Sequence, residues 1–309
     1  MSEADTRIAV VGAGAIGGWI AGRLALAGNR VMALGSRGPL DTIEIEEAGK
    51  RDAVRLNQFG GPADVLAIAV KAPSLADAAK AASPLIGPDT VIVTMLNGVP
   101  WRFTDEPLRS IDADGRISRA LPTNQVIGCV VHAACHRPAA GHVVVDMADR
   151  LLIGEPDGET SERLALLYAL FAEAGLKPDM TGNIRRATWY KLWGNATINP
   201  LSALTRATAD HLLGEPVLRA FMAEAMEELA EIGAAIGCPI TESSEDRMAV
   251  TARLGSFKPS MLQDVEAGRP IELEALVGAP REIAARNGIQ TPTLDRIYAM
   301  ARFLQPRSP

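Results

Sequence analysis

"RIAVVGAGAIGGWIAGRLALAG", residues 7–28, is the stretch that decides the fold of this 309-residue chain. It begins with a short apolar run that is typical of a buried strand, and residues 15–28 have the composition of a helix. Between them, Gly12, Gly14 and Gly17 stand at the spacing G-x-G-x-x-G. In such a turn the first glycine permits the tight bend, the second lets a ligand approach the backbone, and the third lets helix and strand pack closely. The stretch therefore predicts a strand, a glycine turn and a helix in direct succession.

A glycine turn between a strand and a helix is suited to the pyrophosphate of a dinucleotide, because the helix N-terminus offers unpaired N–H groups and a positive dipole. We therefore expect a dinucleotide cofactor at the five residues Gly12, Gly14, Ala15, Ile16 and Gly17. The alternative is a glycine-rich turn with a purely structural role, since the chain contains 28 glycines.

The end of the second predicted strand indicates which dinucleotide is bound. Proteins that bind NAD place an aspartate or glutamate there, which grips the ribose 2′-hydroxyl. No acidic residue lies between Gly18 and Leu40, and the stretch "LGSRG" offers Ser36 and Arg37 instead. A hydroxyl and a guanidinium suit a 2′-phosphate. The pattern favours NADP, and the alternative is that Arg37 is a solvated loop residue.

The rest of the first half alternates apolar segments with a helical pattern, which predicts a parallel sheet covered on both faces. Further along, three strand patterns follow one another without a helix, and we expect them in the far half of the same sheet with antiparallel pairing. The predicted strands are 30–34, 64–70, 90–96, 126–134, 141–147 and 150–155, and the predicted helix is 74–83.

Beyond about residue 182 the strand patterns stop and helical patterns take over. The predicted helices are 184–199, 216–237, 270–288 and 293–304. The fold class that we expect is α/β, with a Rossmann-type dinucleotide-binding domain at residues 1–182 followed by an all-α C-terminal domain at residues 183–309.

The bulk properties narrow the partners and the compartment. A net charge of −6 argues against nucleic-acid binding. The acidic N-terminus has the wrong sign for a signal peptide, and the apolar run 8–22 is too short and glycine-rich to span a membrane. The three cysteines are too scattered for a disulfide framework. These features predict a cytoplasmic protein with no membrane partner.

The stretch "CVVHAACH", residues 129–136, gathers two cysteines and two histidines and invites interpretation as a metal site. On a strand, Cys129 and Cys135 face one side while His132 and His136 do not join them, so four ligands cannot converge. No second cluster of ligands accompanies them. We expect core cysteines and strand-end histidines, and no metal.

"WYKLWGNATINPLSALT", residues 189–205, is an apolar helix with an unusual polar stripe. Lys191, Asn195 and Asn199 recur every four residues and fall within a stripe about 80° wide. Taken alone, the stripe has two explanations: a reactive face, or a lysine that reaches solvent and asparagines that cap or kink the helix before Pro200.

In combination with the glycine turn, this helix resembles that of the ketopantoate reductase (2-dehydropantoate 2-reductase) family. The stretches that carry the resemblance occur in the order of the family: "VVGAGAIGG", "AVKAPSL", "TMLNGVPW", "WYKLWGNATINPLSALT" and "KPSMLQDVEAGRPIELEALVG". The glycine turn is generic, whereas K-x-x-x-N-x-x-x-N-P followed by S-M-L-Q-D and a later glutamate is specific.

The resemblance implies an NADPH-binding Rossmann-type domain, a helical domain, and an active site in the cleft between them. It implies that Lys191 is the catalytic lysine and that Glu272 completes the catalytic site. Asn195, Asn199 and Ser260 match the family's substrate-binding residues. Lys71 and Asn97 match residues near the cofactor, the second of them beside the nicotinamide.

The implied reaction fits these residue types. Reduction of a 2-oxo acid by NADPH turns a ketone into an alkoxide, which an ammonium can both stabilise and protonate. Lys191 is the expected general acid, Glu272 can accept a hydrogen bond from a hydroxyl, and the amides bind polar substrate atoms without adding charge. The leading substrate is 2-dehydropantoate, which would be reduced to pantoate.

Some residues depart from the family pattern and leave the substrate open. Ala209, Asp210 and Phe257 stand where ketopantoate-specific members tend to carry amides. In the long segment 101–125, Trp101 or Phe103 could line a modified site, or the segment could be a surface insertion.

Two alternatives follow: a dehydrogenase of another 2-oxo or 2-hydroxy acid in catabolism, or an NADP-binding sensor without catalysis. The amphipathic helices are compatible with a homodimer and equally with packing inside one domain.

Overall fold

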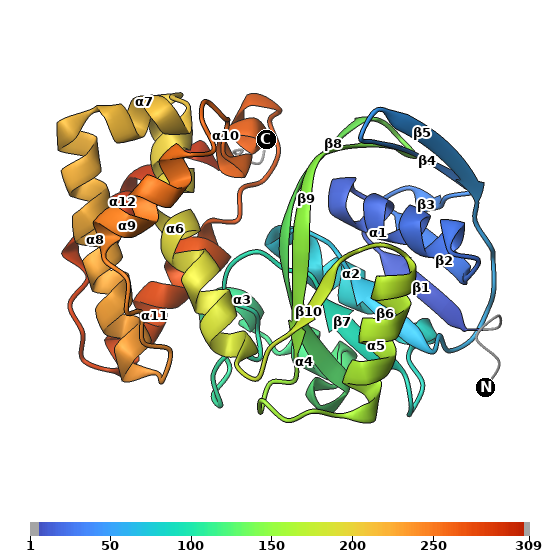
Figure 1. The fold of residues 1–309 in the computed structure, drawn as a ribbon. Helices are drawn as coiled ribbons and strands as arrows, with labels where there is room; N and C mark the ends of the chain where they lie inside the picture. The colour runs from blue at the N-terminus through green and yellow to red at the C-terminus, as the bar shows by residue number, and fades with distance from the viewer. Residues whose placement is uncertain (1–5, 306–309) are drawn as a thin grey trace. The chain divides into compact units, whose positions relative to one another are not determined.

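The computed structural model describes residues 6–305. The N-terminal stretch MSEAD, which belongs to the segment used to judge a signal peptide, lies outside the described residues. The chain forms two compact units (Figure 1). Unit 1 comprises the chain up to Leu96 together with Gly115–Ile184, and unit 2 comprises Asn97–Asp114 together with the chain from Arg185 onward. The change at residue 184 falls near the predicted boundary, but the sequence did not indicate that Asn97–Asp114 belongs with the C-terminal helices.

Unit 1 is built on one mixed sheet, and its parallel centre confirms the predicted α/β fold. Strands β2, β1, β6, β7 and β8 lie side by side in that order, and all four neighbouring pairs are parallel. In the described part of the chain the sheet contains β1 (Arg7–Val11), β2 (Arg30–Gly35), β3 (Gly38–Pro39), β4 (Thr42–Glu47), β5 (Lys50–Arg55), β6 (Val65–Ile68), β7 (Val91–Thr94), β8 (Val126–Ala139), β9 (His142–Gly154) and β10 (Pro178–Met180).

The predicted antiparallel half of the sheet is also confirmed, although its strands differ in part from those predicted. The segments predicted as strands 141–147 and 150–155 form a single long strand, β9, which pairs antiparallel with β8. The β4–β5 hairpin was not predicted. It joins the sheet because β4 pairs in parallel with β9. β4 reads TIEIEE and β5 reads KRDAVR, so both strands are rich in charged residues, which are poor indicators of a strand.

The helix after the glycine turn, α1 (Ala15–Leu26), is covered by strands of this half of the sheet, among them β4 and β9 (Figure 1). A Cβ atom on Gly18 would lie 2.8 Å from Val143 of β9, and one on Gly22 would lie 2.5 Å from Ile45 of β4. A side chain at either of these two positions would push the strands away from α1. Gly18 and Gly22 therefore allow α1 to be enclosed by strands that are distant in the sequence.

The remaining helical segments of unit 1 cover the sheet or connect its strands. Ser161 caps the N-terminus of α5, where its side-chain oxygen accepts a hydrogen bond from the backbone N–H of Leu164. These segments are η2 (Ala72–Ser74), α2 (Leu75–Ala82), η3 (Ser83–Leu85), α4 (Arg116–Ala120), η4 (Thr123–Gln125) and α5 (Glu162–Glu173).

Unit 2 is helical, as predicted, and is organised around α6 (Ile184–Thr205). The indole N–H of Trp189 donates to the carbonyl of Leu229, and that of Trp193 donates to the carbonyl of Met226, so one side of α6 is held against α8. The other elements are α3 (Arg109–Asp112), α7 (Ala209–Gly214), α8 (Pro216–Ala235), α9 (Ser244–Ala252), α10 (Ser260–Glu266), η5 (Glu274–Gly278), α11 (Ala279–Arg286), α12 (Pro292–Ala301) and η6 (Arg302–Leu304).

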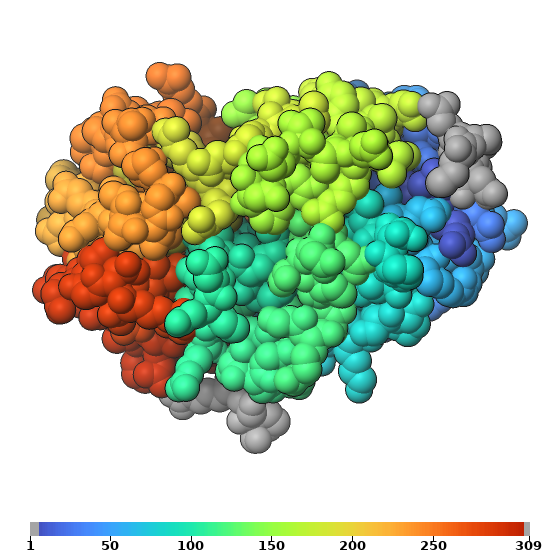
Figure 2. Space-filling view, turned by 90° about the horizontal axis from the view of Figure 1, so that it is seen from below, coloured from blue at the N-terminus to red at the C-terminus, as the bar shows by residue number. Residues whose placement is uncertain are grey.

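The segment Asn97–Asp114 packs into unit 2. Phe103 is 4% exposed, and its ring stacks on Trp189 with centroids 5.8 Å apart, while Trp101 is 2% exposed. The buried Phe103 is therefore a core residue of unit 2, and the segment is not a surface insertion. In Figure 2 the green chain near residue 110 lies against the red C-terminal helices.

The predicted helix 270–288 begins later than expected and contains a widened turn. Residues 270–272 are not helical, and Glu274–Gly278 form a π-helical turn before α11. Gly98, with φ of +84°, lies against this turn, and the backbone N–H of Val99 donates to the carbonyl of Ala275 over 2.9 Å. The contact holds the start of the Asn97–Asp114 segment beside Glu272. Within residues 6–305, no helix has the length and apolar character needed to cross a membrane.

Candidate active site

The three glycines of the turn have the distinct geometries that the sequence predicts. Gly12 has a φ of +101°, and a Cβ there would lie 2.6 Å from the carbonyl oxygen of Ala69. A Cβ on Gly17 would lie 2.1 Å from the carbonyl oxygen of Gly12, so this glycine sets the contact between helix and turn. On Gly14 the nearest atom would be 4.0 Å away, which leaves that side open. An open side at a helix N-terminus suits an approaching pyrophosphate.

The first turn of α1 adds nothing that would repel an anion. Its N-cap is Gly14, with no side-chain capping bond, and no acidic residue stands in the first turn, where Ala15, Ile16 and Gly17 lie. Main-chain N–H groups of a first helical turn have no partners inside the helix. These residues therefore fit a dinucleotide phosphate.

Ser36 and Arg37 form the two-residue turn between β2 and β3, and both are exposed. The ladder pairs Gly35 with Gly38, so the two side chains stand at the tip of the hairpin. Among the described residues no carboxylate pairs with the Arg37 guanidinium. Lys71 lies just beyond the end of β6, two residues after Ala69. It occupies the N-cap position of η2 without a side-chain capping hydrogen bond.

The predicted polar stripe on α6 is real. Among residues 191–200, all of them described, only Lys191 and Asn195 are partly exposed, and the rest are buried. Asn199, one turn further on, is 5% exposed. Lys191, Asn195 and Asn199 share one face of a continuous helix that also accommodates Pro200.

Asn97 joins the stripe to the downstream glutamate. The side-chain amide of Asn195 donates to Asn97 Oδ1 over 2.9 Å, and the amide of Asn97 donates to Glu272 Oε2 over 3.3 Å. Glu272 is only 6% exposed, so its carboxylate depends on such partners. The sequence suggested a place beside the cofactor for Asn97, and this link within unit 2 was not foreseen.

A second link fixes the far end of the stripe. The amide of Asn199 donates to Ser260 Oγ over 3.4 Å, and Ser260 is the first residue of α10. The structure therefore brings together Asn97, Asn195, Asn199, Ser260 and Glu272, all within unit 2. Polar groups in a row on a largely buried face can orient a small polar ligand.

The departures from the family pattern lie next to this row. The backbone N–H of Ala209 donates to the carbonyl of Phe257 over 3.0 Å, and Phe257 packs against the apolar core of unit 2. Asp210 is partly exposed, and hydrogen bonds from Thr208 and then Ser256 lower its pKa. Ala209 and Phe257 are therefore in contact, and Phe257 stands three residues before Ser260.

The stretch "CVVHAACH" occupies β8. Cys129 is buried in the core of unit 1, whereas burial, followed by the charge of Asp146, raises the pKa of the Cys135 thiol to about 12. His136 Nδ1 lies 2.8 Å from the carboxylate of Asp146. No group of three or more potential ligands for a metal ion occurs among residues 6–305.

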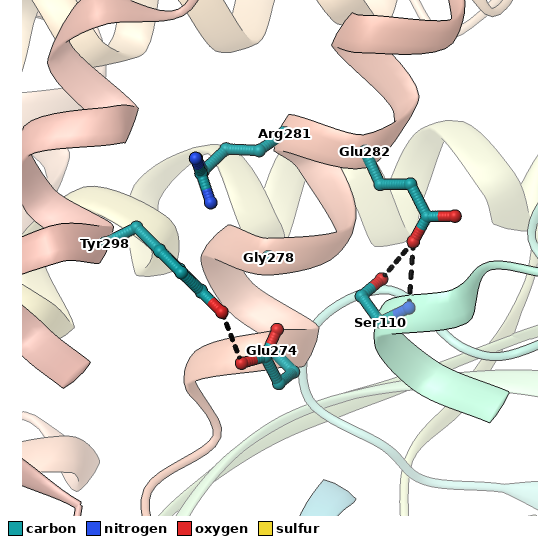
Figure 3. A pocket seen from close by; sticks show the side chains of 6 residues that line it. All are labelled: Ser110, Glu274, Gly278, Arg281, Glu282 and Tyr298. Carbon is teal, nitrogen blue, oxygen red and sulfur yellow. Dashed lines mark hydrogen bonds between the residues drawn. The ribbon is translucent and has the colours of Figure 1, made fainter. Parts of the chain in front are cut away.

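A polar pocket of about 300 Å³ in unit 2 was not predicted (Figure 3). Tyr298 donates to Glu274 Oε1 over 2.7 Å, and the Ser110 hydroxyl donates to Glu282 over 2.7 Å. Burial favours a higher pKa for Glu282, but hydrogen bonds from Ser110 and neighbouring groups outweigh it and lower that pKa. These bonds tie α3 to α11. The lining residues are Ser110, Glu274, Gly278, Arg281, Glu282 and Tyr298.

Comparison with known proteins places the chain in one family. The model described as "Ketopantoate reductase PanE/ApbA" matches residues 8–158, and its C-terminal counterpart matches residues 183–305. A 2-dehydropantoate 2-reductase of Mesorhizobium japonicum is 36% identical over 96% of this chain and 97% of its own. A crystal structure from Ralstonia solanacearum MolK2 is 43% identical over 97% of both chains, with a TM-score of 0.91.

A more distant structure shares the fold alone. A D-mandelate dehydrogenase solved with NADH and anilino(oxo)acetate has a TM-score of 0.82 at 19% identity, over 97% of this chain and 98% of that one. The two family models and the Mesorhizobium relative together cover both units of the fold described above. The chain belongs to the ketopantoate reductase family, oxidoreductases that act on a CH–OH group.

Proposed function

We propose that the protein is an NADPH-dependent reductase of a small 2-oxo acid, with 2-dehydropantoate as the leading substrate and pantoate as the product. The observation that carries the proposal is the row Lys191, Asn195 and Asn199 on α6, tied to Glu272 through Asn97 and to Ser260 directly. The relative from Mesorhizobium japonicum, named 2-dehydropantoate 2-reductase, supports this substrate.

In the proposed reaction, the charged side chains and the neutral side chains have different roles. NADPH, when bound, supplies the hydride. Lys191 holds its ammonium at the ketone oxygen, stabilises the negative charge that develops there and gives up a proton to it. Asn195 and Asn199 orient polar atoms of the substrate without adding charge, and Ser260 offers a hydroxyl beside Asn199. Glu272 accepts hydrogen bonds, from Asn97 and from a substrate hydroxyl.

The choice of NADPH over NADH rests on the tip of the β2–β3 hairpin. Ser36 and Arg37 present a hydroxyl and a guanidinium, with no carboxylate between Gly18 and Leu40 to favour a ribose 2′-hydroxyl. Arg37 can form paired hydrogen bonds with a phosphate. We expect the Arg37→Ala variant to lose NADPH affinity and to keep its weaker NADH affinity.

The deciding experiment measures NADPH oxidation with a panel of 2-oxo acids, and repeats it with NADH. The proposal expects the highest kcat/KM for 2-dehydropantoate with NADPH. No turnover of any 2-oxo acid, together with tight NADPH binding, would instead indicate a sensor. A preference for NADH would contradict the role of Arg37.

A second candidate is the same reaction on a different 2-oxo or 2-hydroxy acid. Phe257 favours it, because an apolar ring stands three residues before Ser260 where an amide was expected. If 2-oxo acids with an apolar side chain are turned over faster than 2-dehydropantoate in the same panel, this candidate replaces the first.

The proposal also includes a cytoplasmic location and a homodimer. The free thiols of Cys129, Cys135 and Cys238 support a reducing compartment. Light scattering on the purified protein measures the assembly directly, and a monomer mass would remove the dimer from the proposal.

A further inference from the structure

Arg137, in unit 1, has no role in the reaction proposed above. It lies 124 positions after Ala13 in the sequence, yet its Nη1 donates a hydrogen bond to the Ala13 carbonyl over 3.2 Å. Ala13 is the residue between Gly12 and Gly14. A cation from the far half of the sheet is therefore held at the glycine turn.

A bulge in the β8–β9 pair gives Arg137 this position. The ladder pairs His136 with Val144 and Ala139 with His142, so Arg137 and Pro138 together face Val143 alone. A bulge of this kind bends a strand and redirects its side chains. Val143 is also the residue against which Gly18 of α1 packs. The bulge and the N-terminal half of α1 are thus parts of one contact.

The charge of Arg137 is not neutralised by an acidic side chain in the described part of the chain. Among residues 6–305 no carboxylate pairs with its guanidinium, and its one hydrogen bond is to the Ala13 carbonyl. Within β8 and β9, the acidic residue closest in sequence to the bulge is Asp146, and its carboxylate lies 2.8 Å from His136 Nδ1. In a chain of net charge −6, a cation without an acidic partner at a glycine turn is suited to a bound anion.

The turn itself is open where such an anion would arrive. A Cβ on Gly14 would meet no atom closer than 4.0 Å, and the first turn of α1 has no acidic residue. Resting on the proposed function, we propose that Arg137 binds the pyrophosphate of the dinucleotide. Arg137 then contributes equally to the binding of NADPH and of NADH, whereas Arg37 contributes only to the binding of the 2′-phosphate.

Two fragments of the cofactor separate these roles. ADP-ribose carries the pyrophosphate and lacks the 2′-phosphate, and adenosine 2′-monophosphate carries only the latter. Isothermal titration calorimetry measures both Kd values for the wild type, Arg137→Ala, Arg137→Lys and Arg37→Ala. Arg150→Ala, which removes an exposed arginine from β9 of the same ribbon, is the matched control.

For Arg137→Ala we expect ADP-ribose to bind about tenfold more weakly, as for the loss of one charge-assisted hydrogen bond, and adenosine 2′-monophosphate to bind as in the wild type. Arg37→Ala should show the reverse pattern, Arg137→Lys should recover part of the affinity, and Arg150→Ala should match the wild type.

Equal ADP-ribose binding by the wild type and Arg137→Ala would overturn the assignment of Arg137. An equal loss for both fragments, with a lower melting temperature, would mean that Arg137 only shapes the turn, and it would overturn the assignment as well. If the wild type binds neither fragment nor NADPH, the proposed function itself fails, which is a different result from either.

Discussion

The side-chain amide of Asn195 donates a hydrogen bond over 2.9 Å to the side chain of Asn97, a residue 98 positions earlier in the chain. Asn97 in turn donates to the buried Glu272. One asparagine therefore connects the polar stripe of α6 with the carboxylate that follows α10. The order of these three residues along the chain gives no sign of that connection.

Removing this connection should affect stability and turnover together. Asn97→Ala removes one hydrogen bond from the Glu272 carboxylate and one from the Asn195 amide, which should lower the free energy of unfolding by about 1–3 kcal/mol. We expect kcat/KM to fall by at least about tenfold, because Glu272 and Asn195 lose their common support. Urea unfolding and steady-state kinetics measure the two effects. The exposed Asn124→Ala serves as control, and a variant as active as that control would show that the link is dispensable.

Lys191 is predicted to act on the rate more than on cofactor binding. Lys191→Ala should lower kcat by about 10²–10⁴-fold, the usual contribution of a positioned general acid, with little change in the Kd of NADPH. Lys191→Arg keeps the charge but holds its proton too firmly to recover the rate. Stopped-flow kinetics and fluorescence titration separate the two quantities, with the exposed Lys80→Ala as control. A kcat within about threefold of that of Lys80→Ala would remove Lys191 from the role of acid.

Substitution by alanine should have different effects at two glycines of the turn, lowering stability at one and cofactor affinity at the other. A methyl group on Gly17 would lie 2.1 Å from the Gly12 carbonyl oxygen, so Gly17→Ala should destabilise the fold by about 1–3 kcal/mol. On Gly14 the methyl group meets open space, so Gly14→Ala should melt like the wild type yet bind NADPH at least about tenfold more weakly. If Gly14→Ala binds NADPH normally, the turn has a structural role alone.

Phe257 should influence which acid is accepted. Phe257→Asn replaces the apolar ring three residues before Ser260 by an amide, and we expect the ratio of kcat/KM values to move toward 2-dehydropantoate and away from apolar 2-oxo acids. Phe257→Leu, which keeps an apolar side chain, is the comparison. Identical substrate ratios in the two variants would assign Phe257 to the core of unit 2.

Cys135 should be unreactive in the native protein and should make stability depend on alkaline pH. Burial raises the pKa of its thiol from 9.0 to about 12, so the native state holds the proton more tightly than the unfolded state. The stabilising contribution is complete below pH 9 and is lost as the pH rises toward 12. Cys135→Ala should flatten that decline in urea unfolding between pH 8 and about 10.5.

The same thiol can be followed chemically. Alkylation by iodoacetamide at pH 8, resolved by mass spectrometry, should be much slower at Cys135 in the native chain than in the unfolded chain, because the thiolate is the reacting form. Equal rates in the two states would show that the thiol is not protected.

Local features of the chain were predictable because they depend on residues that are close in the sequence. The strand, turn and helix of residues 7–28 follow from the spacing of Gly12, Gly14 and Gly17, and each glycine has the geometry that its place in the motif requires. The stripe on α6 follows from the period of the helix, which places Lys191, Asn195 and Asn199 on one face whatever surrounds them.

Other features depend on which distant surfaces pack together, and only the tertiary structure decided them. The β4–β5 hairpin closes over α1 because Gly18 and Gly22 have no side chains, and Asn97 joins unit 2 because Gly98 fits against the widened turn of residues 274–278. The Arg137 hydrogen bond to Ala13 likewise arises from a bulge opposite Val143. Periodicity and turn chemistry act over a few residues, whereas these contacts are set by steric fit between segments that the sequence keeps far apart.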